Sequence, residues 1–235
     1  LAGVDVAIKV FHKLDPQLKI DVLIKDGSSV KPKDVVFTVE GKVQSILQAE
    51  RLMLNIMQRM SGVATATNRY VALIEGTGAK VLDTRKTTPG MRMLEKQAVR
   101  LGGGVNHRIG LFDMILLKDN HIDFAGGIEN AVRGAKRYLK EKNKSLKIEV
   151  EVRDIDELNE VLRVGGVDRV MLDNFTPAAT KEAVQIVNGR VELESSGGIT
   201  SETIRSYAET GVDYISVGAL THSVKGLDMS LIATT

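Results

Sequence analysis

Short runs in which hydrophobic and polar residues alternate recur along the second half of the chain, and longer amphipathic stretches separate most of them. Alternation with a period of two predicts a strand, whereas apolar residues three and four apart predict a helix. Six runs predict strands, at residues 79–83, 113–118, 146–152, 168–173, 190–195 and 213–218. The clearest helices are predicted at residues 156–165, 178–189 and 201–211. This strand–helix repeat indicates an α/β protein with a parallel sheet.

The ends of the last four predicted strands are evenly spaced, since Glu151, Asp173, Ser195 and Val217 follow one another at intervals of 22 residues. Equal strand–helix units are typical of a closed (β/α) barrel or an open doubly wound sheet. The strands show no reversal signal and no Rossmann-type glycine fingerprint, so the pattern favours the barrel. The segment 102–110, GGGVNHRIG, is a candidate for a seventh strand.

The first 60 residues have a different pattern. Two alternating runs, 18–25 and 34–41, flank a polar stretch with Gly and Pro, which predicts strand, turn, strand. A long helix is predicted from residue 44, with a break or bend at Ser61-Gly62. We therefore expect an N-terminal α+β domain at 1–60 and a (β/α) barrel domain at 61–235.

Composition excludes several classes of protein and of site. The chain has 235 residues, no cysteine and a net charge of +2, so disulfides, thiolate metal sites and general polyanion binding, including nucleic acid, are not expected. No apolar run has the ~18 residues that a membrane span needs, and no signal-peptide pattern is visible, which favours a cytoplasmic protein. The histidines lack metal-ligand spacing with carboxylates, so no structural zinc is expected. The sequence starts at Leu1, so we expect an N-terminal segment to precede it.

Positive charge is concentrated between residues 84 and 118, a segment that contains seven Lys and Arg residues but only two acidic residues. In a (β/α) barrel the chemistry lies at the carboxyl ends of the strands. Four cations follow the carboxyl ends of predicted strands and would lie near one another in the barrel: Arg85, Lys86, Arg108 and Lys118. Arginine binds planar carboxylates in a bidentate manner, so we expect a carboxylated ligand here.

Acidic residues occupy the neighbouring strand ends. Alternation places Glu149 and Glu151 on one face of their strand, pointing into the barrel, where a buried carboxylate needs a partner. Lys118 and a bound ligand are the candidate partners, and a purely internal salt-bridge layer is the alternative. Glu151 and Asp173 suit ribose hydroxyls or a hard cation such as Mg²⁺.

Two glycine-containing strand ends, ESSGGIT and VGALTHS, have the character of a phosphate site. Glycine lets backbone N–H groups approach an oxyanion closely, and the last two strand–helix loops of a barrel often bind phosphate. The predicted phosphate ligands are Ser196, Gly197, Gly198, Gly218 and Ala219. Together with the cations, this arrangement predicts a phosphorylated sugar at one end of the site and a carboxylated partner at the other.

Seven collinear motifs resemble the quinolinate phosphoribosyltransferase family: ERLMLNIMQRMSGVATAT, LDTRKTTPG, VRLGGGVNHRIGLFDMILLKDNHI, IEVEV, VMLDNFTP, ESSGGIT and ISVGALTHSVKGLDMSL. The resemblance spans nearly the whole chain. It implies an incomplete (β/α) barrel of six to seven parallel strands, a smaller N-terminal α+β domain and a homodimer. It also implies the reaction of quinolinate with phosphoribosyl pyrophosphate and Mg²⁺ to give nicotinate mononucleotide, pyrophosphate and CO₂, a step of de novo NAD biosynthesis.

The resemblance also implies residue roles. Substrate-binding positions are Arg51, Thr84, Arg85, Lys86, His107, Arg108, Lys118, Glu151, Asp173, Ser196, Gly197, Gly198, Gly218 and Ala219. Of these, Arg51 would reach the partner subunit's site, and the two glycine loops would hold the 5′-phosphate. The implied catalytic residues are Lys86, Lys118, Glu151 and Asp173, the last two with Mg²⁺. Members of the family carry a few dozen residues before LAGV.

Three other interpretations remain open at this point. A strand-end lysine such as Lys118 could form a Schiff base in an aldolase-like barrel. A related phosphoribosyltransferase acting on nicotinate would need fewer cations. The segment 22–41 has the hairpin style of a biotinyl or lipoyl carrier, although it lacks a modifiable lysine on a tight turn.

Overall fold

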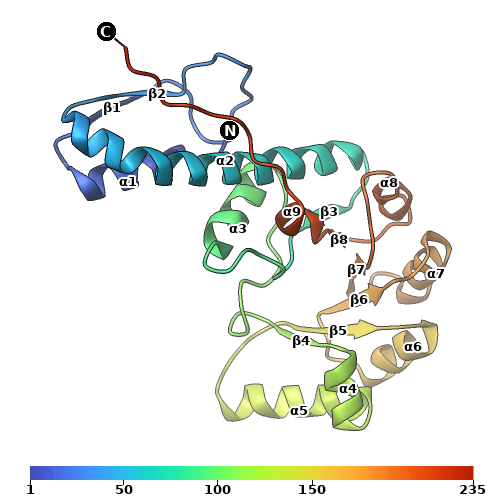
Figure 1. Cartoon of the computed structure of the whole chain (residues 1–235). Helices are drawn as coiled ribbons and strands as arrows, with labels where there is room; N and C mark the ends of the chain where they lie inside the picture. The colour runs from blue at the N-terminus through green and yellow to red at the C-terminus, as the bar shows by residue number, and fades with distance from the viewer. Residues whose placement is uncertain (235) are drawn as a thin grey trace. The chain divides into compact units, whose positions relative to one another are not determined.

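The computed structural model describes residues 1–234, and the chain forms two compact units (Figure 1). The first compact unit consists of Leu1–Arg69, Lys86–Gly104 and Ala219–Thr235. The second consists of Tyr70–Arg85 and Val105–Gly218. Each unit is therefore assembled from segments that are far apart in the sequence. Within the described residues, no helix is long and apolar enough to cross a membrane.

The second compact unit contains a six-stranded parallel sheet, as the alternating runs predict. Its strands are β3 (Lys80–Leu82), β4 (Ile115–Leu117), β5 (Ile148–Val152), β6 (Arg169–Asp173), β7 (Glu192–Ser196) and β8 (Tyr214–Ser216). The strand order is β3-β8-β7-β6-β5-β4, with β3 and β4 at the two edges. The barrel is therefore incomplete. In place of a seventh strand, Val105 makes a single parallel bridge to Leu82 of β3.

Helices follow the strands of this unit and pack on them (Figure 1). They are α4 (Asp119–Ala125), α5 (Ile128–Glu141), α6 (Ile155–Val164), α7 (Pro177–Val187) and α8 (Ile204–Ala208). Helix α7 begins where Thr176 accepts a hydrogen bond from Ala179 N at 3.2 Å, with Pro177 in the first turn. Helix α8 is shorter than predicted because the Thr203 hydroxyl accepts from Thr200 N at 3.0 Å and holds residues 200–203 in turns.

The first compact unit combines helices with a two-stranded antiparallel sheet. Its elements are α1 (Val4–Leu14), β1 (Lys19–Val22), β2 (Phe37–Glu40), α2 (Val43–Leu73, of which residues 70–73 belong to the second unit), α3 (Arg92–Leu101) and α9 (Ala219–His222). Helices α1 and α2 share a core that includes Phe11, Met53 and Met57, each at most 2% exposed. The methionines of α2 are thus packing residues, as their spacing predicts.

The predicted break at Ser61-Gly62 is wrong, because α2 continues from Val43 to Leu73. Ser61 Oγ donates to Ala2 O at 3.0 Å and accepts from Ala2 N at 2.9 Å, which ties the N-terminal segment to the helix. A Cβ at position 62 would lie 2.4 Å from Lys225 O. Gly62 therefore serves close approach of the C-terminal segment, which runs along α2 in Figure 1, rather than a change of helix direction.

Candidate functional site

The carboxyl ends of β4, β5 and β6 bring three predicted site residues together. Lys118, directly after β4, donates from Nζ to Glu151 Oε2 of β5. Glu151 is 6% exposed, so the lysine satisfies a buried carboxylate, as the sequence predicts. Burial and the nearby charge of Glu151 raise the pKa of Asp173, while Lys118 opposes that rise. The rim therefore carries two acidic groups and one ammonium group in mutual electrostatic contact.

The segment after Val105 is anchored by a fully buried carboxylate. Asp83, which follows β3, accepts from His107 N at 2.8 Å and from Asn106 Nδ2 at 2.6 Å. These bonds fix the backbone that carries Arg108. A second carboxylate, Asp113, accepts from Ile109 N at 2.7 Å and closes the other side of the turn. Neither acid was among the predicted site residues, although Asp83 ends the predicted strand 79–83 and Asp113 begins the predicted strand 113–118.

Two arginines of the candidate site lie close to each other in the second compact unit. Partial burial and the positive charge of Arg85 lower the pKa of Arg108, and the carboxylates of Glu149 and Asp113 oppose this effect. Arg108 also donates to Met114 O at 3.4 Å. Two adjacent cations repel one another, so an anion bound between them would be stabilised by both.

The glycine loop after β7 has a conformation that requires glycine. Gly197 has φ +97°, and a Cβ there would lie 2.1 Å from Asn174 Oδ1. Asn174 N donates to Ser196 O at 2.9 Å, and Asp173 is in register with Ser196. The loop is therefore packed directly against the rim end of β6, which is the place expected for a phosphate ligand beside a ribose.

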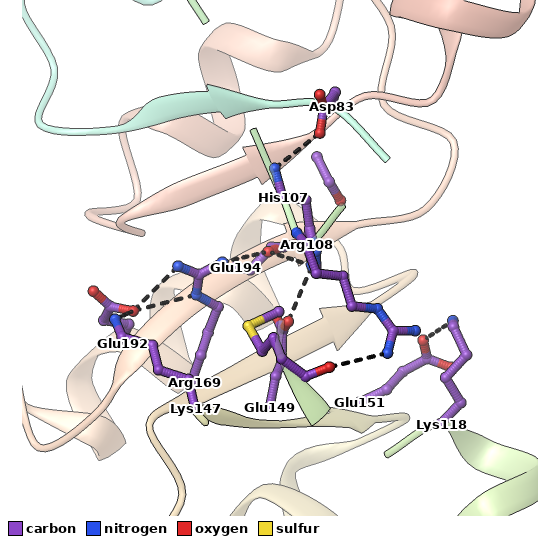
Figure 2. A network of polar contacts seen from close by, with 12 residues as sticks. Asp83, His107, Arg108, Lys118, Lys147, Glu149, Glu151, Arg169, Glu192 and Glu194 are labelled. Carbon is purple, nitrogen blue, oxygen red and sulfur yellow. Dashed lines mark hydrogen bonds and ion pairs between the residues drawn. The ribbon is translucent and has the colours of Figure 1, made fainter. Parts of the chain in front are cut away.

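A buried polar layer lies below the rim, and Figure 2 shows its contacts. His107 Nε2 is 3.0 Å from Glu149 Oε2 and 3.5 Å from Glu194 Oε2, and both carboxylates are 0% exposed. Arg169 Nη1 lies 3.2 Å from Glu194 Oε2, and its Nη2 lies 3.2 Å from Glu192 Oε2. For Glu149, the internal salt-bridge layer is thus the correct alternative, whereas Glu151 faces the rim.

This layer has too few cations for its carboxylates. Burial raises the pKa of Glu149 to about 7 and that of Glu194 to about 8, with Arg169 opposing both rises. Ligand atoms of His107, Glu149 and Glu194 lie within 4.8 Å of one another, a grouping that spacing in the sequence did not reveal because the residues come from different strands and loops. Since the Arg169 guanidinium already supplies positive charge to Glu194, we assign the group as an internal polar layer rather than a metal site.

The remaining predicted site residues belong to the first compact unit or to the junction between segments. Lys86 and Ala219 begin segments of the first unit, directly after Arg85 and Gly218 in the chain. Arg51 lies on the exposed face of α2. The other predicted site residues belong to the second unit, where His107 lies in the buried layer below the rim: Thr84, Arg85, His107, Arg108, Lys118, Glu151, Asp173, Ser196, Gly197, Gly198 and Gly218.

Comparison with known proteins agrees with this geometry. Residues 1–61 match the family described as "Quinolinate phosphoribosyl transferase, N-terminal domain" and residues 63–232 match its "C-terminal domain". The chloroplastic carboxylating nicotinate-nucleotide pyrophosphorylase of Arabidopsis thaliana is 46% identical, over 98% of this chain and 70% of that protein. A probable carboxylating nicotinate-nucleotide pyrophosphorylase of Bacillus subtilis is 41% identical, over 99% of this chain and 79% of that protein.

A solved structure extends the agreement to the fold. The nicotinate-nucleotide pyrophosphorylase from Francisella tularensis superimposes with a TM-score of 0.90 at 49% identity, covering 97% of this chain and 80% of that one. The sequence motifs, the incomplete barrel and the matches of both domains indicate the same family. The chain therefore belongs to the quinolinate phosphoribosyltransferase family.

Proposed function

We infer that this enzyme transfers the phosphoribosyl group of phosphoribosyl pyrophosphate to quinolinate, releasing pyrophosphate and CO₂ and giving nicotinate mononucleotide for NAD biosynthesis. The observation that carries this inference is that the second compact unit contains both an interacting pair of guanidinium groups, Arg85 and Arg108, and an acidic rim in which Glu151 and Asp173 interact with Lys118. A planar dicarboxylate matches two guanidinium groups in charge and shape. Ribose hydroxyls match the rim carboxylates.

The proposed mechanism begins with orientation of the two substrates. Arg85 and Arg108 hold the quinolinate carboxylates, and Lys86 adds positive charge on the same segment. The glycine loops hold the 5′-phosphate through backbone N–H groups. Fixing both reactants places the pyridine nitrogen opposite the ribose C1 and lowers the entropic part of the barrier. No general base is required, because the ring nitrogen is already nucleophilic.

The chemistry at C1 then depends on charge. Loss of pyrophosphate develops positive charge at C1, and the carboxylates of Glu151 and Asp173 stabilise it. Lys118 neutralises Glu151 before the substrates bind and is available to the substrate's negative charge afterwards. Once the ring nitrogen is alkylated it is cationic, so it stabilises the electron pair that remains on C2 when the 2-carboxylate departs as CO₂. C2 then takes up a proton from water.

Magnesium is part of the proposal. The side chains of Glu151 and Asp173 offer carboxylate oxygens, the donor type that Mg²⁺ prefers, and the raised pKa of Asp173 reflects a site where added positive charge would be favourable. Bound there with the pyrophosphate group, Mg²⁺ would neutralise the leaving group's charge.

The direct test is to incubate the protein with quinolinate, phosphoribosyl pyrophosphate and Mg²⁺ and to measure nicotinate mononucleotide and CO₂. We expect Arg85→Ala to raise the KM for quinolinate and lower kcat/KM. Absence of product from the folded wild-type protein would overturn the function. An unchanged KM and kcat/KM in Arg85→Ala would overturn the assignment of this residue.

The same assay separates the rival activities. A phosphoribosyltransferase specific for nicotinate would form the mononucleotide from nicotinate without releasing CO₂. A Schiff-base aldolase would be trapped by borohydride with a carbonyl substrate at Lys118. The Lys118 amine is held by Glu151, so it would have to leave this carboxylate before it could attack a carbonyl carbon, which opposes the role of a Schiff-base nucleophile.

A homodimer is the proposed assembly, with the apolar exposed face of α2 as the contact. Leu47, which is 62% exposed, lies one turn before Arg51 on the same face of α2, and Leu52, which is 56% exposed, is the next residue after Arg51. Large exposed apolar side chains around a cation suit a subunit interface to which Arg51 contributes. Sedimentation of wild type and Leu52→Glu tests the dimer, and a monomeric wild-type protein would contradict it.

Hybrid dimers test whether Arg51 acts in trans. Arg51→Ala and Lys118→Ala are each expected to be inactive alone. After mixing and subunit exchange, one site of each hybrid would be intact, so about a quarter of wild-type activity should return. No recovery with proven exchange would show that Arg51 acts within its own chain or not at all. We also propose a cytoplasmic location, which a fluorescent fusion of the full-length protein would test.

A further inference from the structure

The segment that carries Lys86 is held by a fully buried carboxylate of the first compact unit. Glu95 of α3 is 0% exposed, and its Oε2 accepts from Thr88 N at 3.0 Å. Its Oε1 accepts from Arg59 Nε at 2.9 Å and from Arg59 Nη2 at 2.7 Å. A buried carboxylate that accepts two hydrogen bonds from a guanidinium group at one oxygen is costly to disturb, so Thr88, bound to the other oxygen, has a fixed position.

A second anchor acts on Lys86 itself. Thr221, which is 0% exposed, donates from Oγ1 to Lys86 O at 2.8 Å. The Lys86 side chain is exposed although its backbone carbonyl is held. Arg59 Nη2 donates to Thr221 O, and Arg59 Nη1 donates to Val224 O at 3.3 Å. Arg59 therefore links α9, which contains Thr221, to Glu95. Glu95 in turn binds Thr88, on the segment that carries Lys86.

The same contacts connect the segment of Lys86, at the proposed quinolinate end of the site, to the loop of Ala219, at the proposed phosphate end. Helix α9 begins at Ala219, a proposed phosphate ligand, and Thr221 lies two residues later in that helix. We infer that Arg59, Glu95 and Thr221 are positioning residues, which fix the Lys86 backbone relative to the Ala219 loop and so set the point from which the Lys86 side chain reaches the substrate. This inference rests on the proposed function, in which Lys86 contacts substrate.

Thr221→Val is the sharpest test, because valine keeps the shape of threonine and removes only the hydroxyl. Glu95→Gln would leave Arg59 without a charged partner and risks unfolding, so it is a poorer probe. We expect Thr221→Val to lower kcat/KM for quinolinate about tenfold, the loss of one well-placed hydrogen bond. Thr221→Ser, which restores a hydroxyl, should recover most of that loss.

A double-mutant cycle with Lys86→Met separates positioning from general structural support. If Thr221 acts through Lys86, Thr221→Val should change kcat/KM by less than about twofold in the Lys86→Met background. Thr77→Val is the matched control, since Thr77 Oγ1 also donates to a backbone carbonyl, Ile74 O, at 2.8 Å. We expect wild-type kinetics from that control.

The outcomes are distinguishable from those of the functional test. If the wild-type protein forms no nicotinate mononucleotide, the proposed function fails. If the wild-type protein is active and Thr221→Val has wild-type kinetics, or if its effect adds fully to that of Lys86→Met, the positioning role is overturned. A loss of kcat/KM that tracks a lower Tm, with no recovery in Thr221→Ser, would also overturn it.

Discussion

Glu194→Gln offers a direct test of the buried polar layer. Burial raises the pKa of Glu194 from 4.5 to about 8 in the folded protein. Between those pH values the folded state holds a proton that the unfolded state has released. The associated stability is fully present below pH 4.5 and is lost as the pH rises through about 8. Glutamine has nearly the same shape and cannot ionise, so the variant should lack this pH dependence.

The size of the effect follows from the pKa of the folded state. From pH 6 to pH 8.5 the unfolded chain carries an ionised Glu194 throughout, whereas the folded protein loses most of one proton. At about 1.4 kcal/mol for each pKa unit, the free energy of unfolding of the wild-type protein should fall by about 2.5 kcal/mol through this residue. Glu149, whose pKa is about 7, is electrostatically coupled to Glu194, so the substitution also changes the titration of Glu149. The figure of about 2.5 kcal/mol is therefore the order of magnitude of the difference between the two proteins.

Urea unfolding at pH 6 and pH 8.5 measures this difference. We expect the free energy of unfolding of Glu194→Gln to fall less over this interval than that of the wild type. Glu192→Gln is the matched control, because Glu192 is on the same strand and also contacts Arg169, yet its pKa is lowered and it does not titrate in this range. Equal pH dependence in Glu194→Gln and wild type would refute the reasoning.

Two further predictions concern glycines. Gly62→Ala should destabilise the protein by about 1 to 3 kcal/mol, because its Cβ would lie 2.4 Å from Lys225 O, whereas Gly134→Ala in α5 has open space and should not destabilise it. Thermal unfolding compares the two, and equal Tm values would contradict the close-approach role. Gly197→Ala should raise the KM for phosphoribosyl pyrophosphate roughly tenfold, since φ is +97° and Asn174 would be displaced. Unchanged steady-state kinetics would remove this loop from the phosphate site.

Local patterns in the sequence were sufficient for the sheet but not for every helix. Helix α1 was not predicted, although Val4, Ala7 and Phe11 are buried at the helical spacing that packs it on α2. Its β-branched residues obscure the signal, because their intrinsic preference is for strands and only tertiary packing outweighs it. The break predicted at Ser61-Gly62 was wrong because Gly62 is required by tertiary packing rather than by the local backbone. The C-terminal segment passes so close to α2 that no side chain fits at this position.

Candidate site residues could be named from strand ends, because the position of a residue after a parallel strand fixes the edge at which it lies. The residues that contact these candidates could not be named from the sequence. Asp83 lies in the motif LDTRKTTPG and Glu194 begins the motif ESSGGIT, whereas Arg169 lies just before VMLDNFTP. Their roles come from burial and from contacts with distant residues, which a motif does not show. Likewise, Thr221 meets Lys86 only because the C-terminal segment returns to the first compact unit.

The sequence alone determined the six parallel strands, the loops that need glycine and the concentration of positive charge after residue 84. These depend on residues close in the chain, where period and turn chemistry act directly. Tertiary structure decided which charges meet: it placed Arg85 beside Arg108, and it separated the rim carboxylate Glu151 from the internal Glu149 on the same strand. The physical reason is that burial and Coulombic interaction depend on distance in space, which the order of residues does not specify.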